Sequence, residues 1–155
     1  MKKVQFTKEG FEKIQKEFED ITKNKRPYAI KRLQTARNMG DLSENSEYHA
    51  AKEDLAFIEG RIKELEELLK NADIVEHLAK DTHAVDIGYK VIVDKSGQQI
   101  TYFIVGEFEA NPLENKLSHT SPIGQALLGK KIGDVIEVDV PVGKIMYKIL
   151  DIAVA

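Results

Sequence analysis

Three acidic residues stand at a regular spacing in the first third of the chain, namely Asp41, Glu44 and Glu47. They follow Gly40 directly, within the stretch NMGDLSENSEYHAAKEDL. Such a group of carboxylates could share a hard divalent cation, and Mg²⁺ suits it because Mg²⁺ keeps several waters and needs only one or two protein carboxylates. So few ligands would hold the ion weakly. The spacing therefore predicts acids that complete a Mg²⁺ site with oxygen ligands from another molecule, and no cofactor bound stably by this chain alone.

The same acids have a structural alternative. Asp41 can be the N-cap of a following helix with Glu44 as its N3 partner, which is a capping box, and both charges suit the positive end of a helix dipole. Glu47 would lie beyond the first turn of that helix and is not explained in this way. We expect His49, which has no evident orienting partner, to be structural, and Tyr48 to pack.

The elements that must position these acids are two helical segments, from Thr7, which suits an N-cap, to about Ala72. Their apolar residues recur at steps of three and four, as in the seam of a coiled coil. The first set is Phe11, Ile14, Phe18, Ile21 and Tyr28, and the second is Tyr48, Ala51, Leu55, Ile58, Ile62, Leu65, Leu69 and Ala72. Because Gly40 is a good helix stop, we expect an antiparallel hairpin of roughly 45 Å with the acids at its tip.

Pro27 interrupts the first helical segment. A proline inside a helix removes a hydrogen bond and costs about 3 kcal/mol. We expect a kink or a restart of the helix there, with Pro27 in the first turn of the distal piece. A simple loop between two separate helices is the alternative.

Six basic residues and no acid lie between Ile21 and Gly40, namely Lys23, Lys25, Arg26, Lys31, Arg32 and Arg37. A solvated helix face is one explanation of such a run. However, a solvated helix gains from charges of mixed sign at a spacing of four, and this run forgoes that gain. The alternative is an electrostatic footprint for a phosphate backbone.

The second half of the chain has a different period. Apolar and polar residues alternate on both sides of Ser96-Gly97, which predicts a β-hairpin, and again in DVIEVDVP and KIMYKILDI, which are joined by Val142-Gly143. Ser-Pro at Ser121 and Pro122 opens a short helix that Gly129 ends. The fold class is therefore α+β, with a helical hairpin at 1–75, a linker at 76–82 and a small antiparallel sheet domain with one short helix at 83–155.

Composition bounds what the protein can be. The chain has 155 residues, 42% of them hydrophobic, a net charge of −3 and no cysteine. Disulfide frameworks and thiolate metal sites are excluded. No apolar run approaches the roughly 20 residues that span a bilayer, and the first ten residues lack the apolar core of a signal peptide. We expect a cytoplasmic protein with no membrane partner, and a monomer.

Two long motifs carry a resemblance to a known family. GDLSENSEYHAAKEDLAFIEGRIKELE and SPIGQALLGKKIGD closely resemble the two signatures of the bacterial transcript cleavage factors of the GreA/GreB family, in the right order and at the right separation. The resemblance implies an N-terminal antiparallel coiled coil and an FKBP-like C-terminal domain. It also implies a factor that is not itself an enzyme. Such a factor enters the secondary channel of bacterial RNA polymerase and stimulates the polymerase's cleavage of backtracked nascent RNA.

The resemblance also assigns roles to residues. The family's tip acids match Asp41 and Glu44, which would share a Mg²⁺ ion of the polymerase site, and Glu47 lies in the same motif. Arg37 and Lys52 match the basic patch that contacts the RNA 3′ end. The loop Thr120-Ser121-Pro122 matches the docking loop for polymerase, although family members often have an acid at the position of Thr120.

Three alternatives remain open. A channel-binding paralogue would inhibit the polymerase, but the Asp-x-x-Glu tip favours an activator. A peptidyl-prolyl isomerase would need an aromatic-lined apolar cavity. The C-terminal half offers few aromatic residues, and two of them, Tyr102 and Phe103, are adjacent in a strand and so face opposite sides. A coiled-coil adaptor without chemistry would explain neither the basic run nor the acids beyond it.

Overall fold

The computed structural model describes residues 3–40, 44–76 and 83–155. The chain divides into two compact units, one formed by Phe11–Asn71 and the other by Met1–Gly10 together with Ala72–Ala155. The first unit is a helical hairpin and the second is a curled β-sheet with one short α-helix, as the sequence predicted. Within the described ranges, no helix has the length and apolar character needed to cross a membrane.

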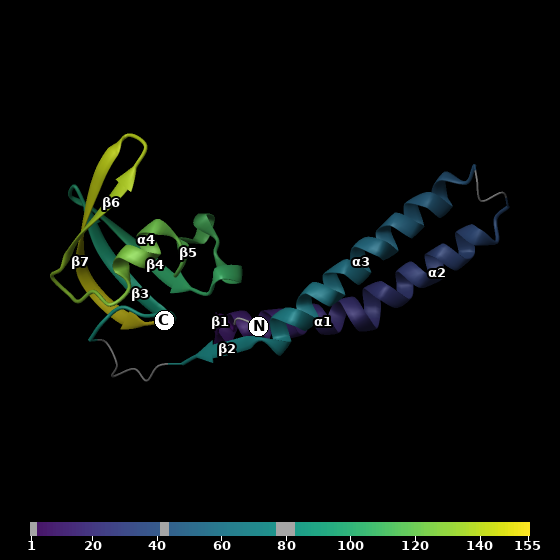
Figure 1. The fold of residues 1–155 in the computed structure, drawn as a ribbon, viewed down its shortest axis with the longest axis horizontal. Helices are drawn as coiled ribbons and strands as arrows, with labels where there is room; N and C mark the ends of the chain where they lie inside the picture. The colour runs from purple at the N-terminus through teal and green to yellow at the C-terminus, as the bar shows by residue number, and fades with distance from the viewer. Residues whose placement is uncertain (1–2, 41–43, 77–82) are drawn as a thin grey trace. The chain divides into compact units, whose positions relative to one another are not determined.

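The hairpin consists of two limbs that lie side by side (Figure 1). The first limb runs through α1 (Lys8–Asp20), a π-helical segment η1 (Ile21–Lys25) and α2 (Arg26–Arg37). The second limb is the single helix α3 (Ser46–Lys70). Its 25 residues correspond to about 37 Å of helix. The end of the hairpin between α2 and α3 is called the tip below.

Small and branched apolar side chains form the seam between the limbs. Its buried members are Ile14, Ile21, Ala29 and Ala36 on the first limb and Ala51, Ile58, Ile62, Leu65 and Leu68 on the second. Three positions of the predicted seam are therefore wrong. Tyr28 is 72% exposed and its neighbour Ala29 is buried instead, and Leu68 rather than Leu69 is buried. Ala72 lies in a strand beyond the end of α3.

The π-helical segment explains the first of these errors. Across it the buried residues are eight apart, Ile21 to Ala29, whereas the steps on either side are seven. A π-turn holds one more residue than an α-turn, and here the N–H of Arg26 donates to the carbonyl of Ile21, five residues earlier. Pro27 then lies in the first turn of α2, which confirms the predicted restart of the helix.

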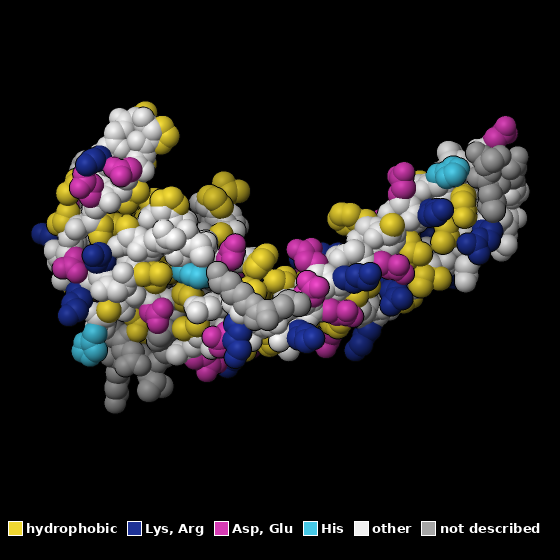
Figure 2. Space-filling view, in the orientation of Figure 1, with side chains coloured by type: hydrophobic (Ala, Val, Ile, Leu, Met, Phe, Trp, Pro, Cys, Tyr) yellow, Lys and Arg dark blue, Asp and Glu magenta, His cyan; other side chains and the backbone are white. Residues whose placement is uncertain are grey.

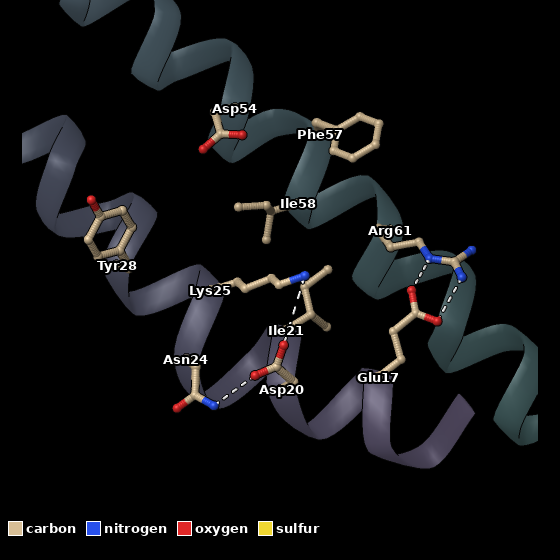
Figure 3. A pocket seen from close by; sticks show the side chains of 10 residues that line it. All are labelled: Glu17, Asp20, Ile21, Asn24, Lys25, Tyr28, Asp54, Phe57, Ile58 and Arg61. Atoms are coloured by element: carbon tan, nitrogen blue, oxygen red, sulfur yellow. Dashed lines mark hydrogen bonds and ion pairs between the residues drawn. The ribbon is translucent and has the colours of Figure 1, made fainter. Parts of the chain in front are cut away.

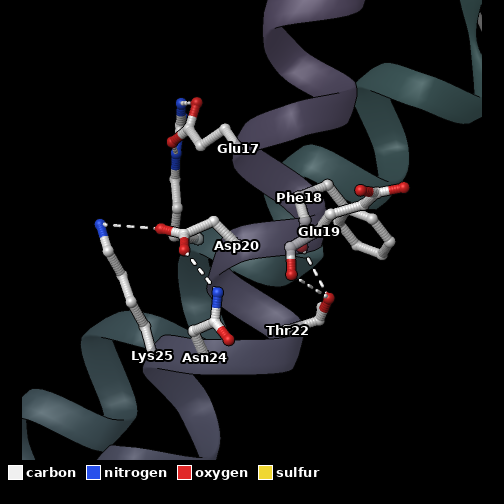
Figure 4. Close-up of polar contacts among 8 residues, drawn as sticks. Glu17, Phe18, Glu19, Asp20, Thr22, Asn24 and Lys25 are labelled. Carbon is white, nitrogen blue, oxygen red and sulfur yellow. Dashed lines mark hydrogen bonds and ion pairs between the residues drawn. The ribbon is translucent and has the colours of Figure 1, made fainter.

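Side chains provide extra hydrogen bonds around this widened turn (Figure 4). The hydroxyl of Thr22 donates to the carbonyls of Phe18, at 2.7 Å, and Glu19, at 3.2 Å. The amide of Asn24 donates to the carboxylate of Asp20 at 2.9 Å. Thr22 thus gives two backbone carbonyls near the wide turn a side-chain partner, and Asn24 joins two side chains across one turn.

Both ends of the helical region form strands that the sequence did not indicate. β1 (Val4–Thr7) pairs in parallel with β2 (Ala72–Val75), so residues 3–10 pack with the second half of the chain rather than with the hairpin. Four-residue strands are too short for a period to be read. The predicted N-cap is supported, because the hydroxyl of Thr7 accepts from the N–H of Gly10 at 3.1 Å.

Glu109 fastens this N-terminal segment within its unit. Its carboxylate accepts from the N–H groups of Thr7, at 2.9 Å, and Gly106, at 3.0 Å, and from the hydroxyl of Thr7. A Cβ placed on Gly10 would lie 2.0 Å from a carboxylate oxygen of Glu109, and one on Gly106 would lie 2.0 Å from the carbonyl oxygen of Gln5. The backbone contact makes glycine necessary at Gly106, whereas a side chain at Gly10 would have to displace the carboxylate of Glu109.

The sheet has five strands in the order β5-β4-β3-β7-β6. They are β3 (Tyr89–Lys95), β4 (Gln98–Val105), β5 (Lys116–Ser118), β6 (Val135–Val140) and β7 (Gly143–Val154). The predicted hairpins at Ser96-Gly97 and before Gly143 are confirmed, and all pairs are antiparallel except β4 with β5. The core of this unit includes Val91, Val93, Ile104, Leu127 and Ile149.

Short helices complete the sheet unit. α4 (Pro122–Leu127) is the predicted helix, and Gly129 beyond its end adopts a φ of +77° that favours glycine. Two 3₁₀ turns, η2 (Glu107–Glu109) and η3 (Pro112–Glu114), were not predicted, because three-residue turns carry no periodic signal.

Candidate functional site at the hairpin tip

The tip turn joins the last turn of α2 to the first turn of α3. α2 ends at Arg37, and Glu44 lies in a turn with its side chain exposed. Asp41, the other predicted tip acid, lies outside the described residues. α3 begins only at Ser46, with Asn45 as its N-cap, so the alternative in which Asp41 and Glu44 form its capping box is wrong.

The side chain of Asn45 bonds to both limbs. Its oxygen accepts from the N–H of Tyr48 at 3.1 Å, in the first turn of α3. Its NH₂ group donates to the carbonyl of Ala36 at 2.8 Å, in the last turn of α2. The N–H of Met39 donates to that same carbonyl at 3.2 Å. Asn45 therefore closes the base of the turn that contains Glu44.

Glu47 lies in the first turn of α3, not beyond it as the sequence suggested, and it is bound across the hairpin. The guanidinium of Arg32 donates to its two carboxylate oxygens at 2.7 and 3.3 Å. This hydrogen-bonded pair lowers the pKa of Glu47 and raises that of Arg32. Arg32 also faces Asp54 at 3.6 Å. The carboxylate of Glu47 is thus already engaged by a cation of its own chain.

The described residues do not form a complete metal site. Among them, no group of three or more histidine, cysteine or acidic side chains could hold an ion. Glu44 makes no hydrogen bond or ion pair with another described side chain, so its carboxylate is open to solvent on the described part of the tip. One free carboxylate fits the role of a partial ligand to Mg²⁺ and does not fit that of a cage.

The basic run between Ile21 and Gly40 divides into two classes. Arg26 and Arg32 pair across the hairpin with Glu59, at 3.8 Å, and Glu47, at 2.7 Å, and Lys25 faces Asp20 at 3.9 Å. The first limb has no acidic residue between Ile21 and Gly40, and the second limb therefore supplies most of the acidic partners. On the face seen in Figure 2, acidic and basic side chains are interspersed along the hairpin.

The other class includes Arg37, which together with Lys52 on α3 is a predicted RNA contact. Both side chains are exposed, and neither forms an ion pair with another described residue. Arg37 ends α2, and Lys52 lies one turn beyond Tyr48 in α3. Tyr48 is half-buried and its ring lies edge-on to that of His49, with centroids 5.6 Å apart, which fits packing roles for both.

An open groove lies further along the hairpin, beside the π-helical segment (Figure 3). Ile21 and Ile58 line it, and the rings of Tyr28 and Phe57 lie on its opposite limbs. Arg61 closes one side, where it donates to both carboxylate oxygens of Glu17 at 2.8 and 2.9 Å. The hydrogen bonds from Arg61 to Glu17 and Glu64 raise the pKa of the guanidinium.

The predicted docking loop is ordered by its own hydroxyl groups. Ser121 is the N-cap of α4, where its hydroxyl accepts from the N–H of Gly124 at 3.1 Å and donates to the carbonyl of Ser118 at 2.7 Å. The hydroxyls of Ser118 and Thr120 lie 2.6 Å apart. Pro122 is exposed at the start of the helix. The loop therefore presents a rigid surface on the sheet unit.

Two tyrosine rings of the sheet unit, those of Tyr102 and Tyr147, contact each other. Tyr102 lies edge-on to Tyr147, with ring centroids 6.3 Å apart. Burial, together with Tyr147, raises the pKa of Tyr102 to about 12. The two rings therefore pack against each other in an edge-on arrangement.

Sequence reasoning missed Asn45 and the partner of Glu47. The sequence did contain a signal for Asn45, because asparagine is a preferred residue at the N-cap of a helix. The bond from Asn45 to Ala36 had no such signal, because it depends on how the two limbs align. The pairing of Arg32 with Glu47 had none either, since fifteen residues separate them.

Two family models cover almost the whole chain. The one described as "Transcription elongation factor, N-terminal" matches residues 4–74, and the one described as "Transcription elongation factor, GreA/GreB, C-term" matches residues 80–154. Transcription elongation factor GreA of Clostridium acetobutylicum is 46% identical over 153 residues, covering 97% of each chain. That of Thermoanaerobacter pseudethanolicus is 47% identical, covering 97% of this chain and 98% of the relative.

Solved structures give a further likeness. The crystal structure of GreA factor homolog 1 (Gfh1) of Thermus thermophilus is 34% identical in sequence, with a TM-score of 0.46, and covers 97% of this chain and 99% of that one. A prokaryotic transcription elongation factor GreA/GreB from Nitrosomonas europaea is 19% identical, with a TM-score of 0.44.

Proposed function

The chain belongs to the GreA/GreB family of transcription elongation factors, and we propose that it enters the secondary channel of bacterial RNA polymerase and stimulates cleavage of backtracked nascent RNA. The observation that carries this proposal is the tip of the hairpin. A two-helix arm, whose second limb alone is about 37 Å long, presents at its end the exposed carboxylate of Glu44, which has no partner among the described residues. Asp41 is three residues away in sequence.

The role proposed for these two acids is to complete a site that the polymerase owns. A second Mg²⁺ in such a site activates the attacking water and stabilises the charge that develops in an in-line displacement at phosphorus. Asp41 and Glu44 would supply oxygen ligands that the polymerase site lacks, and would release them when the arm withdraws. The protein is then a donor of carboxylates and not an enzyme in its own right.

Arg37 and Lys52 would hold the RNA beside the acids. Their charges lie on opposite limbs near the tip and are not neutralised by described acids of this chain. Unpaired cations of this kind bind phosphates through electrostatic attraction that weakens as salt rises. We place the extruded 3′ end of the RNA against them.

Docking to polymerase would use the other unit. Ser121 and Pro122 lie in the ordered loop at the start of α4, where Pro122 is exposed. A surface held in one conformation by internal hydrogen bonds loses little entropy on binding, which favours its use as an anchor. A monomer suffices for every one of these steps.

The test is RNA cleavage in stalled bacterial polymerase complexes that carry 5′-labelled transcripts. Adding the protein should release a shortened transcript that the polymerase then extends. The double variant Asp41→Ala with Glu44→Ala should slow this cleavage roughly 10²–10³-fold, as for the loss of other preorganised electrostatic groups. A channel-binding inhibitor would instead slow elongation and release no fragment.

A matched control removes two acids elsewhere on the arm. Glu53 and Glu66 are exposed on α3 and form no ion pair with described residues. The double variant Glu53→Ala with Glu66→Ala changes the net charge equally and should cleave as the unmodified protein does. If both double variants kept full activity, the assignment of the tip acids would be wrong, and an adaptor without chemistry would be the better description.

A further inference from the structure

We propose that Asn45 is a positioning residue, a clasp that fixes the tip turn so that Glu44 is presented at a constant place. The inference rests on the proposed function, because it concerns how the tip acid is held. The observation is that one side-chain amide bonds to two helix ends. Its oxygen accepts from the N–H of Tyr48 at 3.1 Å, and its NH₂ group donates to the carbonyl of Ala36 at 2.8 Å.

Each of these bonds satisfies a group that a helix end leaves without an internal partner. The N–H of Tyr48 is one of the first in α3, and the carbonyl of Ala36 is one of the last in α2. An N-cap normally satisfies only its own helix. Asn45 does so for two helices at once, and asparagine suits this role because its side chain carries both an acceptor and a donor.

The position of the clasp makes it matter for Glu44. Glu44 is the residue directly before Asn45, so the backbone that carries its carboxylate is joined to a residue held by both helix ends. Anchoring one residue limits the conformations open to the residue beside it. Ala36 is 1% exposed in the seam, so the anchor on the α2 side is fixed by packing.

The test separates a clasp from an ordinary N-cap. Asn45→Ser and Asn45→Asp both keep an oxygen that can accept from the N–H of Tyr48, so α3 should retain its start. Neither can donate to the carbonyl of Ala36 in the same way, because serine is too short to reach it and aspartate places an oxygen against an oxygen. An ordinary N-cap would tolerate both changes, whereas a clasp tolerates neither.

We expect both variants to lower the cleavage rate at saturating protein by about 3- to 10-fold, the range that one hydrogen bond supports. The concentration needed for half-maximal cleavage should not change, since the docking loop is untouched. The second readout needs no polymerase. The N–H of Met39 shares the Ala36 carbonyl, and its hydrogen exchange should speed up in both variants.

Asn24→Ser is the matched control, because the amide of Asn24 bonds only to Asp20 on its own limb among the contacts of the described chain. It should change neither readout. Wild-type cleavage by Asn45→Ser and Asn45→Asp would overturn the clasp, as would a loss seen only in Asn45→Ala. Faster exchange at Met39 with unchanged cleavage would also overturn it. Full activity of the Asp41/Glu44 double alanine variant would instead overturn the proposed function, so the two failures are distinguishable.

Discussion

At the scale of single residues, the three acids of the tip motif have different surroundings despite their equal spacing. Glu44 has no described partner, whereas Glu47 accepts hydrogen bonds from two nitrogens of the Arg32 guanidinium. A carboxylate that already neutralises a guanidinium attracts a second cation less strongly, since the two cations repel each other. Glu47 is therefore better suited to bracing the hairpin than to holding Mg²⁺.

The pairing of Glu47 with Arg32 gives a stability contribution with a defined pH dependence. The pKa of Glu47 is lower in the folded protein than its ordinary value of 4.5, because Arg32 donates to its charged form. A carboxylate with a lowered pKa stabilises the fold above its ordinary pKa, and the contribution disappears as pH falls through the folded-state value. Glu47→Gln should thus lower the melting temperature at pH 7 by a small amount, and the difference should shrink below about pH 4.5.

Thermal unfolding of both proteins between pH 3 and pH 7 measures this difference. Glu66→Gln is the control, because Glu66 is exposed on the same helix and has no ion-pair partner among the described residues. Its difference from the unmodified protein should stay flat with pH. A Glu47→Gln difference that did not depend on pH would show that the ion pair contributes nothing measurable, as is common at protein surfaces.

The roles and partners of single residues could be predicted from the sequence only in part. The sequence singled out Asp41 and Glu44 by spacing and resemblance, and their roles stay predictions. It placed Glu47 in the same group, because spacing records position along the chain and not the cross-limb partner. Only the alignment of the two limbs brings Arg32 to Glu47 and Asn45 to Ala36.

At the scale of elements, the first limb shows why Tyr28 was misplaced. A heptad count from Ile14 through Ile21 arrives at Tyr28, but the buried residue is Ala29. The extra residue lies in the π-helical segment Ile21–Lys25, just before Pro27. The sequence predicted that the helix would restart at the proline. The sequence could not show that one extra residue would be accommodated at this restart, because the choice between a kink and a π-helical turn depends on packing against α3.

This account predicts the effect of removing one residue. Deleting Asn24 should convert the segment to a regular α-helix and bring Ala29 to heptad spacing from Ile21. Pro27 would then lie inside an α-helix, where it costs roughly 3 kcal/mol. The deletion alone should therefore destabilise the hairpin, and the deletion combined with Pro27→Ala should restore the stability to about that of the unmodified protein. Thermal unfolding followed by circular dichroism measures both.

The control for these two variants is a deletion in a regular α-helix, which contains no extra residue to remove. Removing Lys16 from the regular helix α1 rotates every later seam position by about 100° and should abolish the packing of the limbs. Loss of cooperative unfolding in the Asn24 deletion with Pro27→Ala, to the same degree as in the Lys16 deletion, would contradict the π-helical explanation.

At the scale of the whole molecule, the two units carry separable parts of the proposed activity. The hairpin unit, Phe11–Asn71, contains Arg37, Glu44 and Lys52, and the sheet unit contains Ser121 and Pro122. The boundary predicted from the sequence lies at residue 75, but β1 and β2 associate residues 3–10 and 72–75 with the sheet unit. A boundary read along a chain cannot reveal a segment that returns from the other end.

Separable units should give separable kinetics. Pro122→Glu places an acid in the first turn of α4, where the helix dipole accepts it, so the fold should be kept. The new charge alters the exposed docking loop, and it should raise the protein concentration for half-maximal cleavage about tenfold, equivalent to roughly 1.4 kcal/mol of binding, while the maximal rate is unchanged. Glu44→Ala should instead lower the maximal rate and leave the half-maximal concentration unchanged.

Val142→Glu is the control, because Val142 is 94% exposed in the turn between β6 and β7 and takes the same new charge. Titration of each variant into stalled complexes yields both parameters. A lower maximal rate for Pro122→Glu at unchanged half-saturation would mean that the loop acts on the chemistry and not on docking, and the division of labour between the units would have to be given up.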